Sequence, residues 1–582
     1  MKRKDLLNQP LLPLYHTIDE FLSTKSLSPD QLTALRTIGI HDIFSDGQNT
    51  LPTQHLHILT GNPGAGKSYV VETIIEISEL FQHGKTVTSS CYGVAAVAVF
   101  GTTLHSLFKF SFNDNMITTK LTLPPLNPQE IQQMQLDLDY SNLKLLIIDE
   151  FGTCDPTKLA VIDLRLKQIY NNDHLFGGLH CLLVGDLWQL PAISGCFASA
   201  MLEYERFLQL QKKHQNNSLP PKEMTQYHKW RKGKFHIQSL WRKGCSILAS
   251  FKRFHLSTQH RSSDPQHIQF LSDMTNPAKS FDFGNFRNLY QPLTAQDFHD
   301  DPGWKFAPYI VATNRERIQI SHIQAIEYAK ELSSHVIRWP LPISKWINKP
   351  PNEDHQMDAQ QDPAFYEYFV LNAPAYCTSN LNTNLGLANG TPLYLHSIIP
   401  VDDNQSEFIA YQQQTLPCGS IITLTEPPFA INVTIKPRTT SSPPLKAKLS
   451  VIHHHLTQCS VAQTNTGIPI IPILQASSAA SKTYAKPISL PSKQYTVPGN
   501  QGYNPSKITV RPVFPIDLGF AMTVHKAQGC TLLKVILCLA DRPSRLTQMQ
   551  IQSLYVALSR VKLHSNIRLL YHSPNHSPDE VE

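Results

Sequence analysis

The stretch HILTGNPGAGKSYVVETII, residues 57–75, decides the fold class of this chain. An apolar run precedes the glycines, the spacing of Gly61, Gly66, Lys67 and Ser68 fits G-x-x-x-x-G-K-[ST], and apolar residues at helical spacing follow. Glycines let backbone N–H groups turn toward phosphate oxygens, the lysine reaches the β and γ phosphates, and the serine ligates Mg²⁺. The stretch therefore predicts a strand, a phosphate-binding loop and a helix, with ATP and Mg²⁺ as cofactors. The alternative, a glycine-rich turn without a ligand, leaves the flanking strand and helix unexplained.

Two further apolar strands end in polar residues. LKLLIIDE (143–150) ends in Asp149 and Glu150, and HCLLVGDLWQLP (180–191) ends in a Gly-Asp turn that precedes Gln189. Continuous apolar strands that alternate with helical stretches predict a parallel α/β sheet, whose carboxyl edge gathers the ligand-binding loops. We expect Asp149 to hold Mg²⁺ through its water shell and Glu150 to orient or deprotonate the attacking water. Gln189 is expected to sense the γ-phosphate, and its alternative role is that of a turn-stabilising amide.

A second set of α/β segments follows later in the chain. Residues 305–329 predict a strand, a turn and a helix, and residues 516–540 predict a helix, a turn and a strand. Residues 551–562 then predict a helix and residues 566–572 a strand. Two such blocks predict two stacked α/β lobes with the nucleotide between them, an arrangement that can convert hydrolysis into relative motion.

Composition restricts the class of protein. A chain of 582 residues corresponds to about four domain-sized units, and 41% apolar residues suffice for packed cores. The ten cysteines include no C-x-x-C pair, which indicates reduced thiols in an intracellular protein. No apolar run reaches about 18 residues and the first residues lack a signal-peptide core, so we expect neither secretion nor a membrane span.

The positive charge is concentrated in two segments. Residues 206–261 hold thirteen Lys and Arg against one acidic residue, and residues 427–516 hold nine against none. Such clustering favours a track for a polyanion, although two solvated basic loops would give the same pattern. The segment VIHHHLTQC (451–459) is interpreted as a solvated loop rather than a zinc site, because adjacent histidines on a strand point to opposite faces and no C-x-x-C partner exists.

The order of these pieces resembles that of the petite-integration-frequency (PIF-type) DNA helicases and their RecD relatives in superfamily 1. The resemblance runs from about Leu27 to Leu569. Beyond the phosphate loop and the two strands with polar ends, its motifs are SLSPDQ (26–31), SSCYGVAAVAVFGTTLHSLF (89–108), LSTQHR (256–261), GLANGT (386–391), TVHKAQGCTL (523–532) and YVALSRV (555–561). The chain departs from the family pattern at Cys91-Tyr92-Gly93 and at Phe151-Gly152-Thr153.

The resemblance implies two RecA-like parallel-sheet lobes with small accessory insertions, one of them β-barrel-like. It also implies ATP hydrolysis coupled to 5′ to 3′ movement on single-stranded DNA, with unwinding of forked duplexes in replication, repair, recombination or telomere maintenance. The motor would move as a monomer, with an oligomer left open. A nuclear location is favoured, and a mitochondrial, viral or mobile-element context stays open. Two other functions remain alternatives: a nucleotide-gated nucleic-acid-binding subunit that does not unwind, and an RNA-directed motor.

The resemblance also nominates site residues. The catalytic group is Lys67, Asp149, Glu150, Gln189, Arg261 and Arg560, with Arg261 reaching the γ-phosphate across the cleft between the lobes. The ATP-binding group is Gln31, which reads adenine, with Gly61, Asn62, Pro63, Gly64, Ala65, Gly66, Lys67, Ser68 and Gly529. The magnesium ligands are Ser68 and Asp149. The DNA-binding group is Thr103, His105, Thr523, His525 and Lys526, because small donors and imidazoles hold phosphates without reading sequence. A histidine in an apolar helical stretch is also often a hydrogen-bonded core residue.

Domain boundaries follow from the same motifs. We expect an N-terminal segment with the adenine-reading element (1–50), a first lobe (51–200), a basic insertion (201–255), the first part of the second lobe (256–400), an accessory β module with a flexible basic insertion (401–512), and the completing part of the second lobe (513–582).

Overall fold

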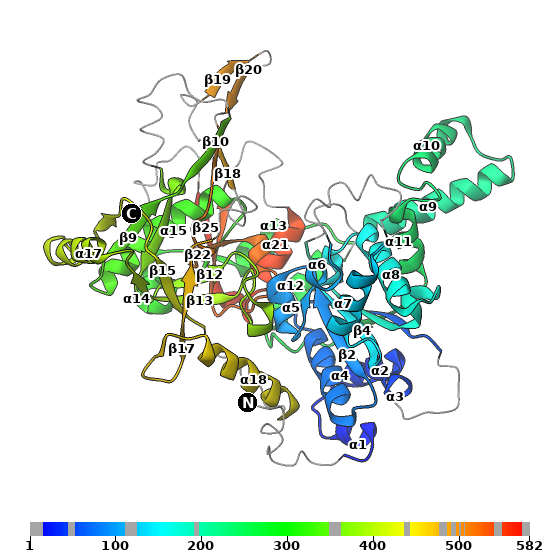
Figure 1. Cartoon of the computed structure of the whole chain (residues 1–582). Helices are drawn as coiled ribbons and strands as arrows, with labels where there is room; N and C mark the ends of the chain where they lie inside the picture. Colours follow the sequence, from blue (N-terminus) through cyan, green and yellow to red (C-terminus); the bar gives the residue numbers. More distant parts are fainter. Residues whose placement is uncertain are drawn as a thin grey trace. The chain divides into compact units, whose positions relative to one another are not determined.

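The chain divides into two compact units, each described here by itself (Figure 1). The first unit comprises Met1–Ile268 and Thr439–Ser450, and the second comprises Gln269–Arg438 and Val451–Glu582. The structure is a computed structural model. It describes residues 15–44, 53–110, 125–190, 197–276, 278–347, 362–435, 443–476, 486–489, 496–499, 502–505, 507–540 and 550–572.

A six-stranded, fully parallel sheet organises the first unit. Its strand order is β3-β2-β4-β5-β1-β6. The strands are β1 (Leu56–Gly61), β2 (Lys85–Ser90), β3 (Thr102–Thr103), β4 (Leu143–Asp149), β5 (His180–Gly185) and β6 (Lys252–Leu256). The parallel α/β sheet predicted from the apolar strands is therefore confirmed.

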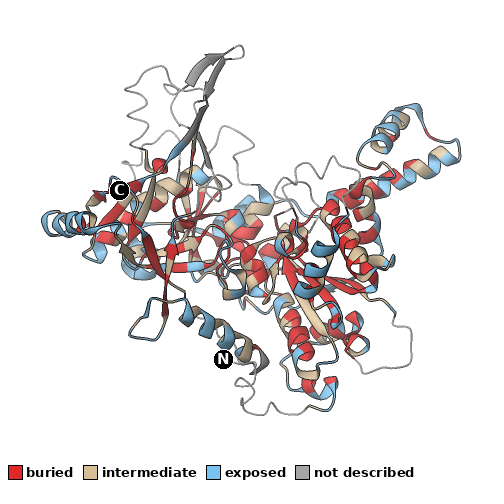
Figure 2. Cartoon of the chain, viewed as in Figure 1, coloured by how far each residue is buried: buried red, intermediate tan, exposed pale blue. Residues whose placement is uncertain are grey.

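Helices cover both faces of this sheet, and the buried strands lie between them (Figure 2). Along β4, Leu145 and Ile147 face the core with α4, whereas Leu146 and Ile148 face the core with α8. This alternation is the two-residue period of a strand buried on both faces. The helices are α1 (Ile18–Ser23), α2 (Pro29–Ile38), α3 (Ile40–Ile43), α4 (Lys67–Phe81), α5 (Gly93–Ala98), α6 (Leu104–Leu107), α7 (Pro128–Leu138), α8 (Pro156–Tyr170), α9 (Phe197–Gln215), α10 (Pro221–Lys232) and α11 (Leu240–Ala249), with 3₁₀ turns η2 (Phe151–Thr153) and η3 (Leu175–Gly178).

The basic segment after residue 200 is helical rather than a solvated loop. Helices α9 and α10 form a hairpin that projects from the first unit (Figure 1). Stacked rings of Phe207, Tyr227 and Phe235 hold the hairpin together, with centroids 5.7 and 4.9 Å from Phe207. The expected boundary at residue 256 is also wrong, because β6 pairs with β1 and the first unit continues to Ile268.

The second unit contains a five-stranded parallel sheet of order β23-β8-β24-β25-β7. Its strands are β7 (Gln291–Pro292), β8 (Tyr309–Val311), β23 (Ala521–Thr523), β24 (Val535–Ala540) and β25 (Ile567–His572). Its helices are α13 (Phe283–Leu289), α14 (Ala295–Asp300), α15 (Asn314–Glu331), α20 (Val524–Ala527) and α21 (Ile551–Leu558), with turns η4 (Pro302–Trp304) and η8 (His564–Asn566). Helix α12 (Pro265–Met274) belongs partly to each unit.

The helix expected at the start of residues 516–540 is wrong. This stretch begins with strand β22 (Ile516–Leu518) and strand β23, and only the four residues of α20 are helical. These residues form strands because neighbouring strands pair with them: β22 is hydrogen-bonded to β12 (Pro374–Cys377), and β23 is hydrogen-bonded to β8. Tertiary pairing therefore overrides the helical pattern of these apolar residues.

An antiparallel module completes the second unit. A six-stranded sheet has the order β16-β17-β15-β13-β12-β22, and smaller sheets have the orders β11-β9-β14, β10-β21-β18 and β19-β20. These strands are β9 (Val336–Pro340), β10 (Ile343–Ile347), β11 (Tyr366–Val370), β13 (Pro392–Ile399), β14 (Ile421–Thr423), β15 (Ala430–Thr434), β16 (Ala462–Gln463), β17 (Pro469–Leu474), β18 (Lys486–Ser489), β19 (Thr496–Gly499), β20 (Gly502–Pro505) and β21 (Lys507–Val510), accompanied by α17 (Asp403–Thr415), η5 (Pro363–Phe365) and η6 (Thr383–Leu385). Helix α18 (Pro443–Gln458) belongs partly to each unit, since residues up to Ser450 are in the first. The barrel-like form stays a prediction. The remainder of the insertion at 438–507 lies outside the described residues.

The histidine run is helical. His453, His454 and His455 lie exposed on α18, not on the solvated loop that we expected. No group of three His, Cys, Asp or Glu side chains suited to a metal ion occurs among the described residues. In the same part of the chain, every helix is too short or too polar to cross a membrane.

Candidate active site

The phosphate-binding loop joins β1 to α4 and requires glycine at two positions. Gly64 has φ +88° and Gly66 has φ +80°, a region that residues with a Cβ rarely adopt. A Cβ at Gly64 would lie 2.1 Å from Gln259 Oε1, and a Cβ at Gly66 would lie 2.1 Å from Gln31 Nε2. The loop is thus closely covered by two segments that are distant in sequence.

Lys67 lies at the centre of the charged groups. Its ammonium donates hydrogen bonds to the carbonyl oxygens of Gly61 (2.6 Å) and Asn62 (3.1 Å). Burial lowers the pKa of Lys67, and the nearby charge of Arg261 lowers it further, whereas Asp186, Glu150 and Asp149 raise it. These mutual influences bring five of the charged residues of the first unit into one site. Ser68 lies beside Lys67 on the first turn of α4 and is exposed.

Asp149 and Glu150 form a tight turn at the end of β4. Glu150 has φ +50°, in the left-handed region, and its carbonyl accepts hydrogen bonds from the backbone N–H (3.0 Å) and hydroxyl (2.7 Å) of Thr153. Burial, followed by the charge of Glu150, raises the pKa of Asp149 to about 7, although the Glu150 N–H and Lys67 oppose the shift. A bound cation would stabilise the ionised form of such a desolvated carboxyl, so this position suits a cation ligand.

Asp186 and Gln189 form a third component at the end of β5. Asp186 accepts hydrogen bonds from the Gln189 amide (3.2 Å) and from the Trp188 N–H (2.9 Å). Gln189 is only 5% exposed, and its Oε1 has no hydrogen-bond partner among the described residues. A buried acceptor of this kind needs a partner, such as a ligand or a water molecule. The arrangement supports both interpretations of Gln189, because the same amide orders the turn and leaves one oxygen available.

Residues 257–261 lie directly on the phosphate-binding loop. The Gln259 amide donates to the Pro63 carbonyl (2.8 Å), and the His260 N–H donates to the Gly64 carbonyl (2.8 Å). The Arg261 N–H is in turn bonded to Gln259 Oε1 (2.9 Å). Arg261 therefore belongs to the first unit, which corrects our expectation that it comes from the second lobe. The reason is that β6 runs parallel to β1 and delivers this segment to the same edge of the sheet.

The start of α2 completes the site from the other side. Gln31 is 1% exposed, accepts from the Ser28 N–H (3.0 Å) and donates weakly to the Gly66 carbonyl (3.5 Å). Asp30 accepts from the N–H groups of Ser257 (3.0 Å) and Thr258 (2.9 Å). Burial opposes ionisation of Asp30, but hydrogen bonds from Ser28, Thr258 and Ser257 outweigh it and lower its pKa.

Sequence reasoning missed several residues of this site. Asp30, Gln259 and His260 fasten the segments around the phosphate-binding loop, and Asp186 supplies a further charge near Lys67. The available signal was their position within the motifs SLSPDQ, LSTQHR and LLVGD, from which we selected only the residues with an expected direct role.

The DNA-binding candidates of the first unit have other partners in the structure. Thr103 is buried and caps α6 by accepting from the Ser106 N–H (3.3 Å), which is a sufficient structural reason for a threonine there. His105 is partly buried, and burial together with the charge of Lys158 lowers its pKa. His105 is therefore neutral at pH 7. Their contact with DNA stays a prediction.

The candidates of the second unit also form internal contacts. Arg560 is 1% exposed, and its guanidinium donates to the carbonyls of Val556 (2.8 Å) and Cys530 (3.2 Å). Lys526 is paired with Asp517 (3.3 Å). The remaining three lie on or beside α20: Thr523 at its N-cap, His525 within it, with a pKa lowered by partial desolvation, and Gly529 in an exposed left-handed turn after it.

The fold and the first-unit site define a P-loop nucleotide-binding protein with two parallel α/β sheets. Residues 28–201 match the family model described as PIF1-like helicase. The resemblance to the PIF-type helicases is thereby confirmed, and it covers the phosphate-binding loop, the two carboxylates and the Gly-Asp turn.

Comparisons with individual proteins agree with this family. The chain is 32% identical over 136 residues to the ATP-dependent DNA helicase RRM3 of Saccharomyces cerevisiae, which is 23% of this chain and 18% of RRM3. It is 28% identical over 152 residues to the ATP-dependent DNA helicase Pif1 of a Psychrobacter species, or 26% and 21% of the two chains. The match thus spans only about a fifth of these relatives.

Solved structures extend the likeness of the fold to nearly the whole chain. The crystal structure of Bacteroides Pif1 bound to single-stranded DNA has a TM-score of 0.51 with this chain at 17% identity, and the likeness covers 94% of this chain and 92% of that one. At this identity the comparison establishes a shared fold.

Proposed function

We propose that this chain is a PIF-type motor that hydrolyses ATP, moves along single-stranded DNA in the 5′ to 3′ direction and unwinds forked duplexes. One observation carries the proposal. Lys67, Glu150, Asp149, Asp186 and Arg261 surround a single phosphate-binding loop, at distances where each alters the pKa of Lys67. A structural ion-pair network would not also require left-handed glycines at Gly64 and Gly66.

The residues of the first unit fit a magnesium-bound triphosphate. Glycines open the loop toward backbone N–H groups, and Lys67 now bonds loop carbonyls that it can exchange for phosphate oxygens. Ser68 and Asp149 are the oxygen ligands that Mg²⁺ prefers. Magnesium, when bound, neutralises charge on the transferred phosphoryl group. Gln31 closes the site beside Gly66, where we propose that it reads the adenine.

The chain's own residues then carry the chemistry. Thr153 holds the backbone of Glu150 in a left-handed turn, and from this turn the Glu150 carboxylate would orient or deprotonate water. Gln189, bonded to Asp186, keeps a buried oxygen acceptor without a partner among the described residues, and this oxygen would bind a ligand or a water molecule. Arg261, anchored through Gln259 above Gly64, supplies positive charge for the transition state. The catalytic role of Arg560, which lies in the second unit, stays a prediction.

We propose DNA as the partner for two reasons: the structural similarity to Pif1 proteins and the exposed positive charge of helices α9 and α10. Among the solved structures with the same fold, Bacteroides Pif1 is bound to single-stranded DNA, and another structure concerns the unwinding of forked double-stranded DNA by two coordinating Pif1 helicases. In this chain, helices α9 and α10 carry exposed cations on a firm aromatic core, namely Arg206, Lys212, Lys213, Lys222, Lys229, Arg231 and Lys232. Such a surface neutralises phosphates without reading bases.

The two alternatives predict different results in one assay. Strand displacement is measured on 5′-tailed and 3′-tailed duplexes of DNA and of RNA, with and without ATP, using the natural chain and Lys67→Ala. The proposal requires that the natural chain displaces the strand of the 5′-tailed DNA duplex when ATP is present. The Lys67→Ala variant should displace no strand. Binding without displacement would favour the non-unwinding subunit, and displacement of RNA alone would favour the RNA motor. The intact charges at the phosphate-binding loop argue against the former.

A further inference from the structure

Two cysteines meet beside the carboxylate turn. The sulfur atoms of Cys91 and Cys154 lie 2.9 Å apart, although the residues are 63 positions apart in the chain. Cys91 directly follows β2, and Cys154 directly follows η2, the turn that begins after Glu150. Because Ser90 is paired with Asp149 of the neighbouring strand β4, Cys91 lies one residue beyond the register that positions the carboxylates, and Cys154 follows the turn that begins after them. Neither cysteine takes part in the function proposed above.

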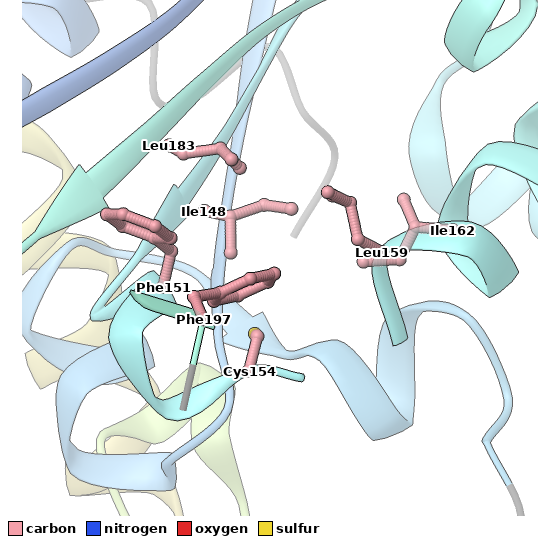
Figure 3. A pocket seen from close by; sticks show the side chains of 7 residues that line it. All are labelled: Ile148, Phe151, Cys154, Leu159, Ile162, Leu183 and Phe197. Atoms are coloured by element: carbon pink, nitrogen blue, oxygen red, sulfur yellow. The ribbon is translucent and has the colours of Figure 1, made fainter. Parts of the chain in front are cut away.

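The two thiols have different environments. Cys91 is partly buried, whereas Cys154 is 4% exposed and lines a small apolar pocket with Ile148, Phe151 and Phe197 (Figure 3). The pocket has no room for a water molecule. The hydrogen bond between the two thiols lowers the pKa of Cys91, with help from Lys158 and Thr153 and against the effect of burial. The same bond, together with burial, raises the pKa of Cys154. Cys91 is thus the thiol that ionises first and can be reached first.

We propose that Cys91 and Cys154 are a redox modification site that forms a reversible disulfide with a peroxide as oxidant. The Cys91 thiolate attacks one peroxide oxygen, the O–O bond breaks, and Cys91 becomes a sulfenic acid while hydroxide leaves and takes up a proton. The Cys154 sulfur then attacks the Cys91 sulfur, the S–O bond breaks, and a second water leaves. In total two thiols lose two electrons and two protons, and one hydrogen peroxide becomes two waters.

The crosslink would act on the nucleotide site. A disulfide bond of about 2.0 Å needs only a small approach of the two sulfurs. It would fasten the end of β2, which leads to α5, to the turn that holds Asp149 and Glu150. This consequence rests on the proposed function, in which Asp149 and Glu150 act on the bound nucleotide: drawing Cys154 toward Cys91 would displace the turn from the position that the two carboxylates need. We expect oxidation to lower ATP turnover several-fold and dithiothreitol to restore it.

The test uses the full chain with Cys418→Ser and Cys459→Ser, which removes the two thiols that are exposed among the described residues. After titration with hydrogen peroxide, peptide mapping should identify a Cys91–Cys154 crosslink that dithiothreitol reverses. Cys154→Ser should instead trap Cys91 as a sulfenic acid that reacts with dimedone, and ATP turnover of Cys91→Ser should not respond to peroxide. The proposal is overturned if Cys154 stays open to alkylation after denaturation while Cys91 is oxidised, or if both remain thiols.

Two outcomes separate this inference from the proposed function. If the crosslink forms but turnover is the same before and after reduction, the regulatory role is refuted. If the reduced chain hydrolyses no ATP, the proposed function is refuted. Peptide mapping of the Cys91–Cys154 crosslink still shows whether the modification site exists.

Discussion

Replacing Asp149 with asparagine should stabilise the nucleotide-free, metal-free chain at pH 8. The folded environment raises the pKa of Asp149 from 3.8 to about 7, which is about three pH units. At 1.36 kcal/mol per unit, ionising this buried carboxyl costs the folded state at most about 4 kcal/mol. The folded state binds this proton more tightly than the unfolded state, so stability falls as pH rises from about 4 to 7 and is constant above that range. Asparagine resembles the protonated carboxyl and removes the cost.

The assay is urea unfolding at several pH values between 5 and 8. Asp149→Asn should be more stable than the natural chain at pH 8, and the difference should shrink by about 1.4 kcal/mol per pH unit below about pH 7, to less than half of its pH 8 value at pH 5. Asp173→Asn, at an exposed carboxylate of the same unit, is the matched control and should show no such trend. If Asp149→Asn is no more stable than the natural chain at pH 8, or if the difference does not depend on pH, the desolvated carboxylate inferred from the structure is refuted.

Three further predictions concern activity. Lys67→Ala should abolish ATP hydrolysis while leaving salt-sensitive strand binding largely intact, and unchanged hydrolysis in a phosphate-release assay would contradict the site. Arg261→Ala should lower kcat by roughly 10³-fold with a far smaller change in nucleotide Kd, because the guanidinium acts on transition-state charge; equal losses in both would argue against this role. Lys229→Glu with Arg231→Glu should reduce the slope of log K against log salt by about 0.7 for each lost single-strand phosphate contact. An unaltered slope in fluorescence anisotropy would remove α10 from the DNA-binding surface.

Local patterns predicted the first unit well. The phosphate-binding loop, β4 with its two carboxylates and β5 with its Gly-Asp turn were all found, because their apolar runs and turn residues reflect interactions between neighbours in sequence. Segments 305–329 and 551–572 were also identified correctly as strand and helix pairs.

Long-range pairing explains the errors. Residues 516–523 became strands because β12 and β8 offered hydrogen-bond partners, which no local pattern records. Residues 451–458 became a helix although their histidine run was interpreted as a loop. Likewise, nothing in the motif LSTQHR indicates that Asp30 holds it, since the two segments are more than 200 residues apart.

The pairing of β6 with β1 sets the smallest fragment that can be catalytically competent. A protein ending at residue 201 would contain all of the segment that matches the family model, yet it would lack the edge strand beside β1 and the loop that carries Gln259 and Arg261. It would leave β1 with an unpaired, aggregation-prone edge and Asp30 without the two N–H donors that it holds. We therefore expect a fragment whose boundaries follow sequence similarity alone to lack part of the proposed site and to aggregate.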